Sequence, residues 1–364
     1  MAKGKEQVNP ESNITVSNLE THRIPKTVNL KRLKIFGVTL TILGIALFAY
    51  FVYSVGIGLI LEGIGRIGFG GFALLMFLYF LRIVCRATAW KLSVYEPHQL
   101  KVRDTLPAVI IGEALSSLIP LGILVSGTSK AIAVRKRVPL VVGLSSIATE
   151  NLFYSLATGL FIVFGAIAFL RSFDLDESWI LTIDVLIGAI FALIIFSVTA
   201  VVRQWHILSS LCEWLYNRHI GRKILEKGRV EARLFENLIF GFYRRHPGRF
   251  LPIFSFQVIY HLLGITEVWF ILSRISANAP DLFASFLLES VSRVITIVFK
   301  LIPFLIGVDE AGAQFVAQTL ALGAGVGVTL AIVRKGRILF WTAIGLILIV
   351  RRGLSIKELS ETLK

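Results

Sequence analysis

Residues 106–126 read LPAVIIGEALSSLIPLGILVS, an apolar stretch that Pro120 and several Gly and Ser residues interrupt. Both flanks are basic, with Arg86, Lys91, Lys101 and Arg103 before the stretch and KAIAVRKR at 130–137 after it. Because basic loops of membrane proteins stay on the cytoplasmic side, the two flanks should lie at the same membrane face. We therefore predict a re-entrant segment that dips into the membrane, sheltered by protein or lining a water-filled cavity.

The composition of the whole chain agrees with a membrane location. Of the 364 residues, 55% are hydrophobic and 17% are charged, and the mean hydropathy is +0.76. Soluble domains are about one-quarter charged, so this composition excludes a soluble globular domain, a disordered protein and a fibrous repeat.

Apolar runs of the length that spans a bilayer, about 20 residues, recur along the chain. They lie at 35–61, 67–90, 138–170, 179–202, 250–274, 282–301, 313–333 and 337–350. These runs predict an all-α polytopic membrane protein with about eight helices plus broken or re-entrant segments. The membrane domain would occupy 35–350, between a disordered cytoplasmic tail at 1–34 and a C-terminal tail at 351–364. We expect a multi-pass protein of the cell inner (plasma) membrane with a cytoplasmic N-terminus.

The segment 203–249 holds ten Lys and Arg residues against four acids, together with Trp205, Trp214, Tyr216 and Phe242. Basic helices with aromatic residues lie on anionic membrane surfaces, so we predict cytoplasmic amphipathic helices on the inner leaflet. The net charge of the chain is +15, and we assign its excess of basic residues to such cytoplasmic segments. It therefore indicates anionic lipid headgroups as partners, rather than nucleic acid.

A weak internal repeat relates the two halves of the chain. EALSSLIPLGILVSG in the first half aligns with VFKLIPFLIGVDEAG in the second on Pro120 and Pro303. Paired, interrupted apolar segments are typical of inverted-repeat transporters, in which they form the central site. A chance match between apolar segments is the alternative.

Charged residues inside apolar runs are the candidate site residues, because an ionisable group in a bilayer faces a partner or a wet cavity. Glu289 and Arg293 are four residues apart and share a helix face, and Lys300 follows on nearly the same stripe. The stripe has one surplus positive charge, which a phosphate-bearing headgroup would satisfy. A salt-bridge network that only locks helices together is the alternative, and both interpretations stay open.

Each predicted break has carboxylates beside it. Glu113 precedes Pro120, and Asp309 and Glu310 follow Pro303. These two acids could also cap the helix that begins near Ala311. Asp184 and Glu267 are closer to helix ends, and we predict that they are interfacial. The predicted substrate-binding set is Glu113, Glu150, Glu289, Arg293, Lys300, Asp309, Glu310 and Arg334, with Pro120, Pro303 and Gly307 as structural breaks.

No motif indicates catalysis, a metal or a cofactor. GIGRIG at 63–68 matches a dinucleotide-binding pattern but stands between two apolar runs, without the strand that this motif requires. The six histidines share no metal-ligand spacing. We predict that the protein is not an enzyme. The alternative is an integral-membrane enzyme in which a carboxylate pair such as Glu113 and Glu310 acts as acid and base.

The segments GEALSSLIPLGILVSGTSKA and LIPFLIGVDEAGAQFVAQTLALG, the latter followed by Arg334, resemble the lysylphosphatidylglycerol synthase transmembrane-region family. This flippase-like domain occurs in the multiple peptide resistance factor of bacteria. The resemblance covers roughly 35–350 and is carried by Pro303, Gly307, Val308 and Glu310, and by Gly112, Glu113, Ser116 and Pro120.

The chain departs from the family pattern in two places. Phe304–Leu305–Ile306 replace a frequent glycine pair, and Asn151 and Tyr154 replace the Arg and Asp of a mid-helix motif, which suggests a different substrate. The resemblance implies a lipid translocator or lipid-binding membrane protein that handles a phosphate-bearing lipid. The alternative is a non-transporting accessory subunit of a lipid-modifying or glycosyl-transferring enzyme.

Overall fold

The computed structural model describes residue 53 and residues 57–118, 122–173, 177–218, 222–276, 281–299, 302–323 and 325–351. All regular structure in these ranges is helical, so the predicted all-α class is confirmed. Several predictions fall outside the described residues. They concern the tail 1–34, most of the run 35–61, Pro120, Lys300 and the C-terminal residues 352–364.

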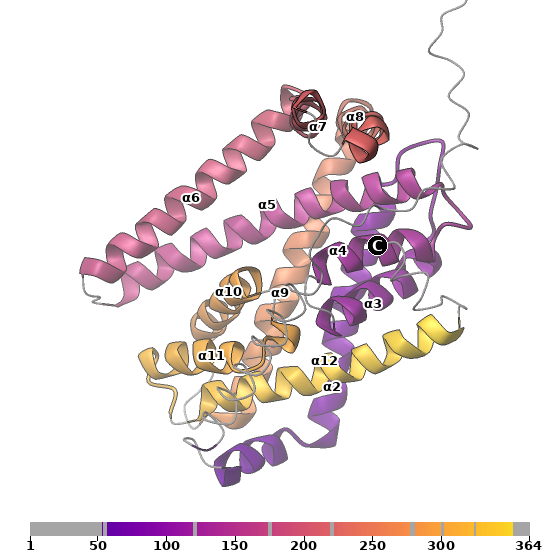
Figure 1. Ribbon diagram of the computed structural model, residues 1–364. Helices are drawn as coiled ribbons and strands as arrows, with labels where there is room; N and C mark the ends of the chain where they lie inside the picture. The colour runs from indigo at the N-terminus through magenta and orange to yellow at the C-terminus, as the bar shows by residue number, and fades with distance from the viewer. Residues whose placement is uncertain are drawn as a thin grey trace, which may run out of the picture.

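The helices follow the apolar runs closely (Figure 1). They are α2 (Ile57–Leu92), α3 (Val102–Leu118), α4 (Gly122–Ala133), α5 (Leu140–Ser172), α6 (Glu177–Val202), α7 (Ile207–Asn217), α8 (Arg222–Arg245), α9 (Phe250–Ile275), α10 (Leu282–Val298), α11 (Val308–Thr319) and α12 (Val326–Arg351), with short 3₁₀ turns η3 (Pro247–Arg249) and η4 (Pro303–Leu305). Four stretches are long and apolar enough to cross a membrane, namely Leu61–Leu92, Leu140–Ser172, Ile180–Val202 and Pro247–Ile275. The protein is therefore a helical membrane protein.

The helices form two similar units of four, α2–α5 and α9–α12, joined by α6–α8. In each unit the second and third helices form a hairpin, α3 with α4 and α10 with α11. The last helix of each unit then packs on the hairpin of the other unit, α5 against α10 and α12 against α3 (Figure 1). Each half therefore makes the same kind of contact with the other half, as expected if the two halves are structural repeats.

Equivalent glycines allow the closest approaches within each unit. Gly143 of α5 packs on Ala131 of α4, and a Cβ at Gly143 would lie 3.4 Å from the Ala131 Cβ. Gly327 of α12 packs in the same way on Ala313 of α11, where the Ala313 carbonyl carbon is 2.5 Å from the position of a Cβ. The absence of a side chain therefore sets the distance between hairpin and closing helix at Gly327, whereas a Cβ at Gly143 would make only an ordinary van der Waals contact.

A second pair of glycines allows close contact between the units. Gly165 of α5 faces Ser290 of α10, whose Cβ is 2.5 Å from the position of an added Cβ. Gly345 of α12 faces Ala114 of α3, and the Ile110 oxygen is 3.0 Å from the position of an added Cβ. Both contacts therefore join the closing helix of one unit to the hairpin of the other unit.

The first helices of the two units, α2 and α9, lie side by side and antiparallel. Gly71 faces Phe270 near one end, Arg82 is bonded to Glu267 further along, and Ala89 packs with Ile253 near the other end. Equivalent helices thus run in opposite directions, as in an inverted repeat. In Figure 1, α2 and α9 cross the middle of the molecule.

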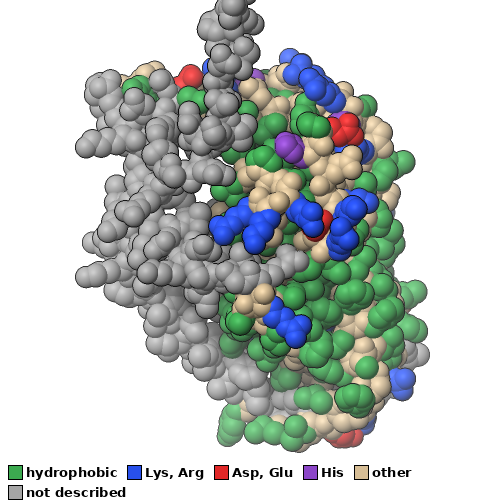
Figure 2. Space-filling view, turned by 90° about the vertical axis from the view of Figure 1, so that its right-hand side faces the viewer, with side chains coloured by type: hydrophobic (Ala, Val, Ile, Leu, Met, Phe, Trp, Pro, Cys, Tyr) green, Lys and Arg blue, Asp and Glu red, His purple; other side chains and the backbone are tan. Residues whose placement is uncertain are grey.

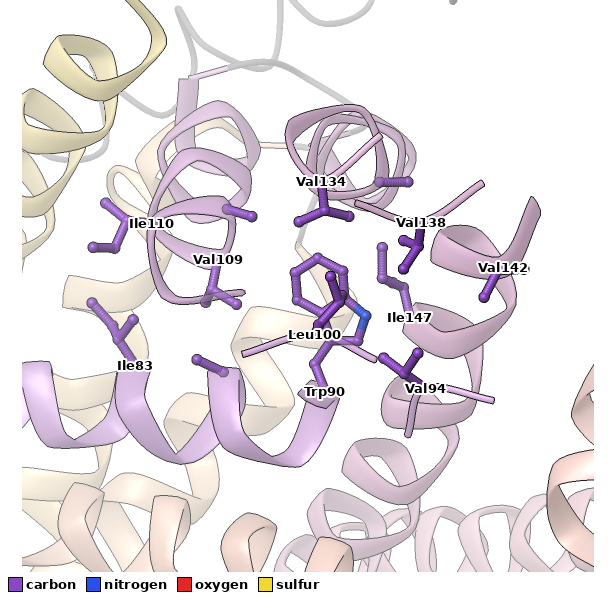
Figure 3. Packing of buried hydrophobic residues seen from close by; sticks show 13 residues of the cluster. Ile83, Trp90, Val94, Leu100, Val109, Ile110, Val134, Val138, Val142 and Ile147 are labelled. Carbon is purple, nitrogen blue, oxygen red and sulfur yellow. The ribbon is translucent and has the colours of Figure 1, made fainter. Parts of the chain in front are cut away.

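The stretch 106–126 forms the α3–α4 hairpin, and the chain enters and leaves it at one end of the molecule. Trp90, in the last turns of α2, donates a hydrogen bond of 2.9 Å to Ser146 near the start of α5. The same tryptophan is the centre of a buried cluster with Val94, Val109 and Ile147 (Figure 3). This is the arrangement that a re-entrant segment requires; its depth in a membrane stays a prediction.

The predicted break between the runs 313–333 and 337–350 is wrong. The charges of RKGR at 334–337 do not end a helix, because α12 continues without interruption from Val326 to Arg351. Arg334, Lys335 and Arg337 are paired with carboxylates of α9, α10 and α11. Paired charges need no water, so they are tolerated inside the helix.

The basic segment 203–249 forms α7 and α8, which pack on each other at one end of α6 and α9 (Figure 1). Glu236 of α8 holds them together by accepting hydrogen bonds from Leu208 N at 2.6 Å and Ser209 Oγ at 2.7 Å. Trp205 and Trp214 are nearly half exposed, as membrane-surface helices require, and contact with the leaflet stays a prediction.

One face of the molecule separates charge from apolar surface. Figure 2 shows Lys and Arg side chains mainly across its upper half, above a surface that is mostly hydrophobic. The basic run Arg135–Arg137, which follows α4, is exposed. This separation agrees with a belt of apolar side chains in lipid and basic groups at one interface.

Substitution of Gly327 by Ala should destabilise the protein, because three backbone atoms of Ala313 and Gln314 lie within 2.5 Å of the position of the new Cβ. We expect a loss of about 1–3 kcal/mol, the range for overpacking, seen as a lower thermal midpoint in detergent. Gly188→Ala in α6 is the control, since nothing lies within 4 Å of its Cβ position. Equal midpoints for the two variants would contradict the packing.

Candidate functional site

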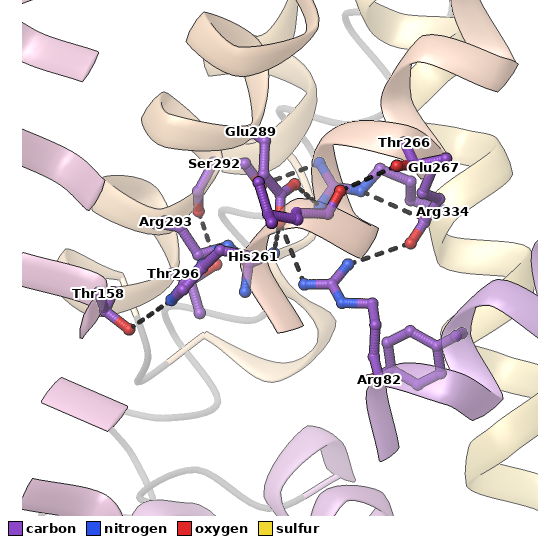
Figure 4. Close-up of polar contacts among 12 residues, drawn as sticks. Arg82, Thr158, His261, Thr266, Glu267, Glu289, Ser292, Arg293, Thr296 and Arg334 are labelled. Carbon is purple, nitrogen blue, oxygen red and sulfur yellow. Dashed lines mark hydrogen bonds and ion pairs between the residues drawn. The ribbon is translucent and has the colours of Figure 1, made fainter. Parts of the chain in front are cut away.

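A buried carboxylate, Glu289 of α10, is the centre of the polar network (Figure 4). Its side chain is fully buried and binds three arginines from three helices. Arg82 of α2 lies 3.1 Å away, Arg293 of α10 at 2.9 Å and Arg334 of α12 at 2.7 Å. Gly264 of α9 makes room for this carboxylate, because a Cβ there would touch Glu289. One side chain therefore connects α2, α10 and α12 against α9.

Glu267 of α9 extends the network. It accepts a hydrogen bond of 3.1 Å from Arg82 and pairs with Arg337 of α12, and Arg334 lies 4.0 Å away. The prediction that Glu267 is interfacial is wrong, since its side chain is 1% exposed. Its position near the end of an apolar run gave no sign of three arginines from distant helices. Asp184, in contrast, is exposed on α6.

A second buried ion pair joins the helices of the first unit. Arg86 of α2 donates to Glu150 of α5 at 3.1–3.2 Å and to Asn151 at 3.2 Å. Gln257 of α9 donates to Glu150 at 2.9 Å. The Asn and Tyr that depart from the family pattern both contact this arginine, since the Arg86 guanidinium lies 4.4 Å from the Tyr154 ring centre.

Two tyrosine rings lie close to arginines of the network. The Arg82 guanidinium lies 4.3 Å from the Tyr260 ring centre, and the Arg337 guanidinium lies 4.1 Å from the Tyr79 ring centre. Such cation–π contacts stabilise a charge where water is scarce. The rings also hold the guanidinium planes in fixed orientations.

The network borders a cavity of about 200 Å³ between the two units. Five arginines from α2, α10 and α12 line the cavity, together with one carboxylate from α3 and one from α11. The charged lining residues are Arg82, Arg86, Arg293, Arg334, Arg337, Glu113 and Asp309. The partner carboxylates Glu150, Glu267 and Glu289 lie behind the arginines and outside the lining. The wall of the cavity is thus mainly cationic.

The structure separates the predicted site residues into three groups. Glu113, Arg293, Asp309 and Arg334 line the cavity. Glu150 and Glu289 lie behind it as partners of the lining arginines. Lys300 lies outside the described residues.

Glu310 has the alternative role that the sequence left open. Its Oε2 accepts a hydrogen bond of 2.8 Å from Gly307 N, which caps α11, and it also pairs with Lys335 of α12. Gly307 has φ 83°, a conformation that favours glycine and ends the turn after Pro303. Glu310 therefore orients α11, so that the preceding Asp309 faces the cavity.

The predicted substrate-binding set does not include Arg82, Arg86 and Arg337, although Arg82 is a charge inside an apolar run. Arg86 lies at the boundary of an apolar run and counted as a loop cation, and Arg337 belonged to the RKGR cluster. The signal that could have found them is spacing, because Arg82 and Arg86 are four residues apart and share one face of α2. No group of His, Cys, Asp and Glu suited to a metal occurs among the described residues.

Comparison with known proteins gives one match. The family model described as the lysylphosphatidylglycerol synthase TM region matches residues 35–345. No curated protein and no solved structure matches significantly. The matched range contains α2 to most of α12, and so both units and every charged residue that lines the cavity.

Glu289→Gln should destabilise the protein strongly, because three buried arginines lose the negative charge that they share. Breaking a buried pair costs about 3–5 kcal/mol, so we expect a large fall in the thermal midpoint in detergent. Glu62→Gln is the control, since its pair with Arg66 is more than half exposed and should change stability by less than about 1 kcal/mol. A midpoint for Glu289→Gln as high as that of the control would show that the arginines do not depend on this carboxylate.

Proposed function

Since the chain belongs to the lysylphosphatidylglycerol synthase transmembrane-region family, we propose that it is a lipid translocator, or a lipid-binding protein, of the cell inner membrane. Its ligand is a lipid with a phosphate-bearing headgroup. The observation that carries the proposal is the cavity between the two units, whose wall presents five arginines and two carboxylates.

Phosphate fits this wall because arginine presents several N–H donors in a planar fork that matches phosphate oxygens. Arg293 and Arg86 are the most exposed of the five, with side chains 9% and 12% exposed. Arg293 Nε is buried, and no described residue accepts a hydrogen bond from it. A buried donor without a partner supports a ligand that supplies one.

The inverted arrangement of the two units supports translocation over static binding. In inverted-repeat transporters the site lies at the repeat interface, and rocking of one repeat against the other exposes it to either side. Here the lining comes from α2, α3 and α5 of one unit and from α9 to α12 of the other. The chain performs no chemical step in this proposal, so the headgroup leaves unchanged.

A second candidate function, an accessory subunit of a lipid-modifying or glycosyl-transferring enzyme, is favoured by α6. Only 6% of its apolar window is buried, against 44% for α9, so most of its surface is available to lipid or to another membrane protein. Co-purification of a stoichiometric enzyme, abolished by charge reversal in 218–233, would establish this candidate. Purification of the chain without such a partner would remove it.

The proposal is tested by reconstituting the full chain in vesicles that contain fluorescent lipids, with a membrane-impermeant quencher outside. We expect headgroups of an anionic or polyprenyl-phosphate lipid to cross, at a rate above that of empty vesicles. Lack of both movement and binding over the whole panel would overturn the proposal.

Arg293→Gln should weaken headgroup binding, since it removes a positive charge from the lining of the cavity. A charge-assisted hydrogen bond contributes about 1.5–3 kcal/mol, so binding should fall roughly tenfold to a hundredfold. Arg274→Gln is the matched control, because this arginine is exposed near the end of α9 and outside the cavity lining. Equal losses in the two variants would place the ligand elsewhere.

A further inference from the structure

Among the described residues, the charged groups that line the cavity and the carboxylates paired with them sum to zero when two of the lining carboxylates are ionised. The five lining arginines share three carboxylates behind them, Glu150, Glu267 and Glu289, and this leaves two positive charges. Glu113 and Asp309 are the two acids on the wall itself. An anion that enters this balanced site adds a net negative charge where water is scarce, and such a charge is expensive.

Glu113 and Asp309 are held by hydroxyl groups rather than by cations. Tyr79 donates a hydrogen bond of 3.0 Å to Glu113, and Ser292 donates one of 3.4 Å to Asp309. Within the part of the chain that the structure describes, no Lys or Arg lies within ion-pair distance of either carboxylate. Each can therefore lose its charge without breaking an ion pair.

One hydroxyl-bearing side chain lies between each carboxylate and an arginine of the network. Ser292 Oγ accepts a hydrogen bond of 3.1 Å from Arg334 and donates to Asp309. Tyr79, which donates to Glu113, has its ring under the Arg337 guanidinium. A change of charge at either acid is thus felt by the arginines that face the ligand.

We infer that Glu113 and Asp309 are proton-binding sites, and that an anionic phosphate headgroup enters the cavity together with protons on these carboxylates. The inference rests on the proposed function and adds its coupling ion. One proton is taken up for each negative charge of the headgroup, up to two. A proton on Glu113 or Asp309 removes one negative charge from the lining, so the total charge of the site is unchanged when one negative charge of a phosphate enters.

The charged and titratable groups around Glu113 and Asp309 are compatible with proton binding at these two carboxylates. Tyr79 and Arg86 of α2, Lys130 of α4 and Arg337 of α12 are the titratable or charged groups on the elements packed against Glu113. The groups that surround Asp309 are Ser292 and Arg293 of α10, Arg334 and Lys335 of α12, and the neighbouring Glu310. Lys335 is paired with Glu310, so it does not neutralise Asp309.

Both acids lie on the hairpins, at positions that the repeat does not relate to each other. Glu113 lies in α3, shortly before the turn of the first hairpin, and Asp309 lies in α11, directly after the turn of the second. Phe304 and Leu305 in that second turn have φ 53° and 51°, a strained conformation for residues other than glycine. The proton sites are therefore on the hairpins, which are the elements that a rocking motion would displace.

The test measures protons directly, by calorimetry of the full chain in detergent with dihexanoyl phosphatidylglycerol, whose single phosphate charge does not titrate near neutral pH. Titrations in two buffers of different ionisation enthalpy give the number of protons taken up. We expect about one proton for each lipid bound, and an affinity that rises about tenfold for each unit that the pH falls while the acids are ionised. Binding without proton uptake, and with no such pH dependence, would overturn the inference and leave the proposed function intact.

The double variant Glu113→Gln/Asp309→Asn mimics the protonated state. We expect it to bind the same lipid at least as tightly as the unmodified chain, with no proton uptake and no dependence on pH. Glu62→Gln, which removes an exposed acid, should keep the uptake of the unmodified chain.

Unchanged proton uptake in the double variant would overturn the inference. Tight binding of short-chain phosphatidylcholine in preference to phosphatidylglycerol would also do so, since a zwitterion needs no proton. Absence of binding of every phosphate lipid would overturn this inference and the proposed function together.

Discussion

The structure depends on the need to compensate arginine and glutamate charges inside apolar helices. An isolated charge at membrane depth costs several kcal/mol, so each must find a partner whatever the rest of the chain does. Glu289 meets this need for arginines on α2, α10 and α12, and Glu267 of α9 shares two of them. Four helices from both units are therefore fixed relative to one another by two carboxylates. The network explains why α12 runs without a break through a cluster of cations that would otherwise require water.

Glycines make this arrangement possible, because the ion pairs form only where helix backbones come close. Gly264 lets Glu289 reach the surface of α9, while Gly165 and Gly345 bring each closing helix against the other unit. Van der Waals packing of small residues is a main source of helix association in lipid, where no hydrophobic drive acts between helices. The cavity between the units is lined by residues of helices that these contacts hold together.

Much of the fold could be predicted from sequence, because apolar length and the distribution of basic residues are local signals. The runs 138–170, 179–202 and 250–274 correspond closely to α5, α6 and α9. The site was predictable only in part. Glu113, Asp309 and Arg293 are conspicuous as charges in apolar stretches, but Arg82 pairs with residues 185 and 207 positions away. Nothing near Arg82 or Glu267 in the sequence encodes those partners, so their roles became visible only when the helices were placed.

The two interpretations that the sequence left open, a structural lock and a ligand site, are compatible because the arginines are not equally committed. Arg82 is 1% exposed and bridges two carboxylates, so its charge is used within the protein. Arg293 has one carboxylate contact, to Glu289 on its own helix, and its side chain is 9% exposed. Arg86 pairs with both oxygens of a single carboxylate, Glu150, and is the most exposed of the five. A phosphate can therefore bind to Arg293 and Arg86 while Arg82, Arg334 and Arg337 keep the helices in place. The lock does not need to open for the ligand to be held, and a hairpin that moves can carry its carboxylate away from the cavity without separating α2 from α9.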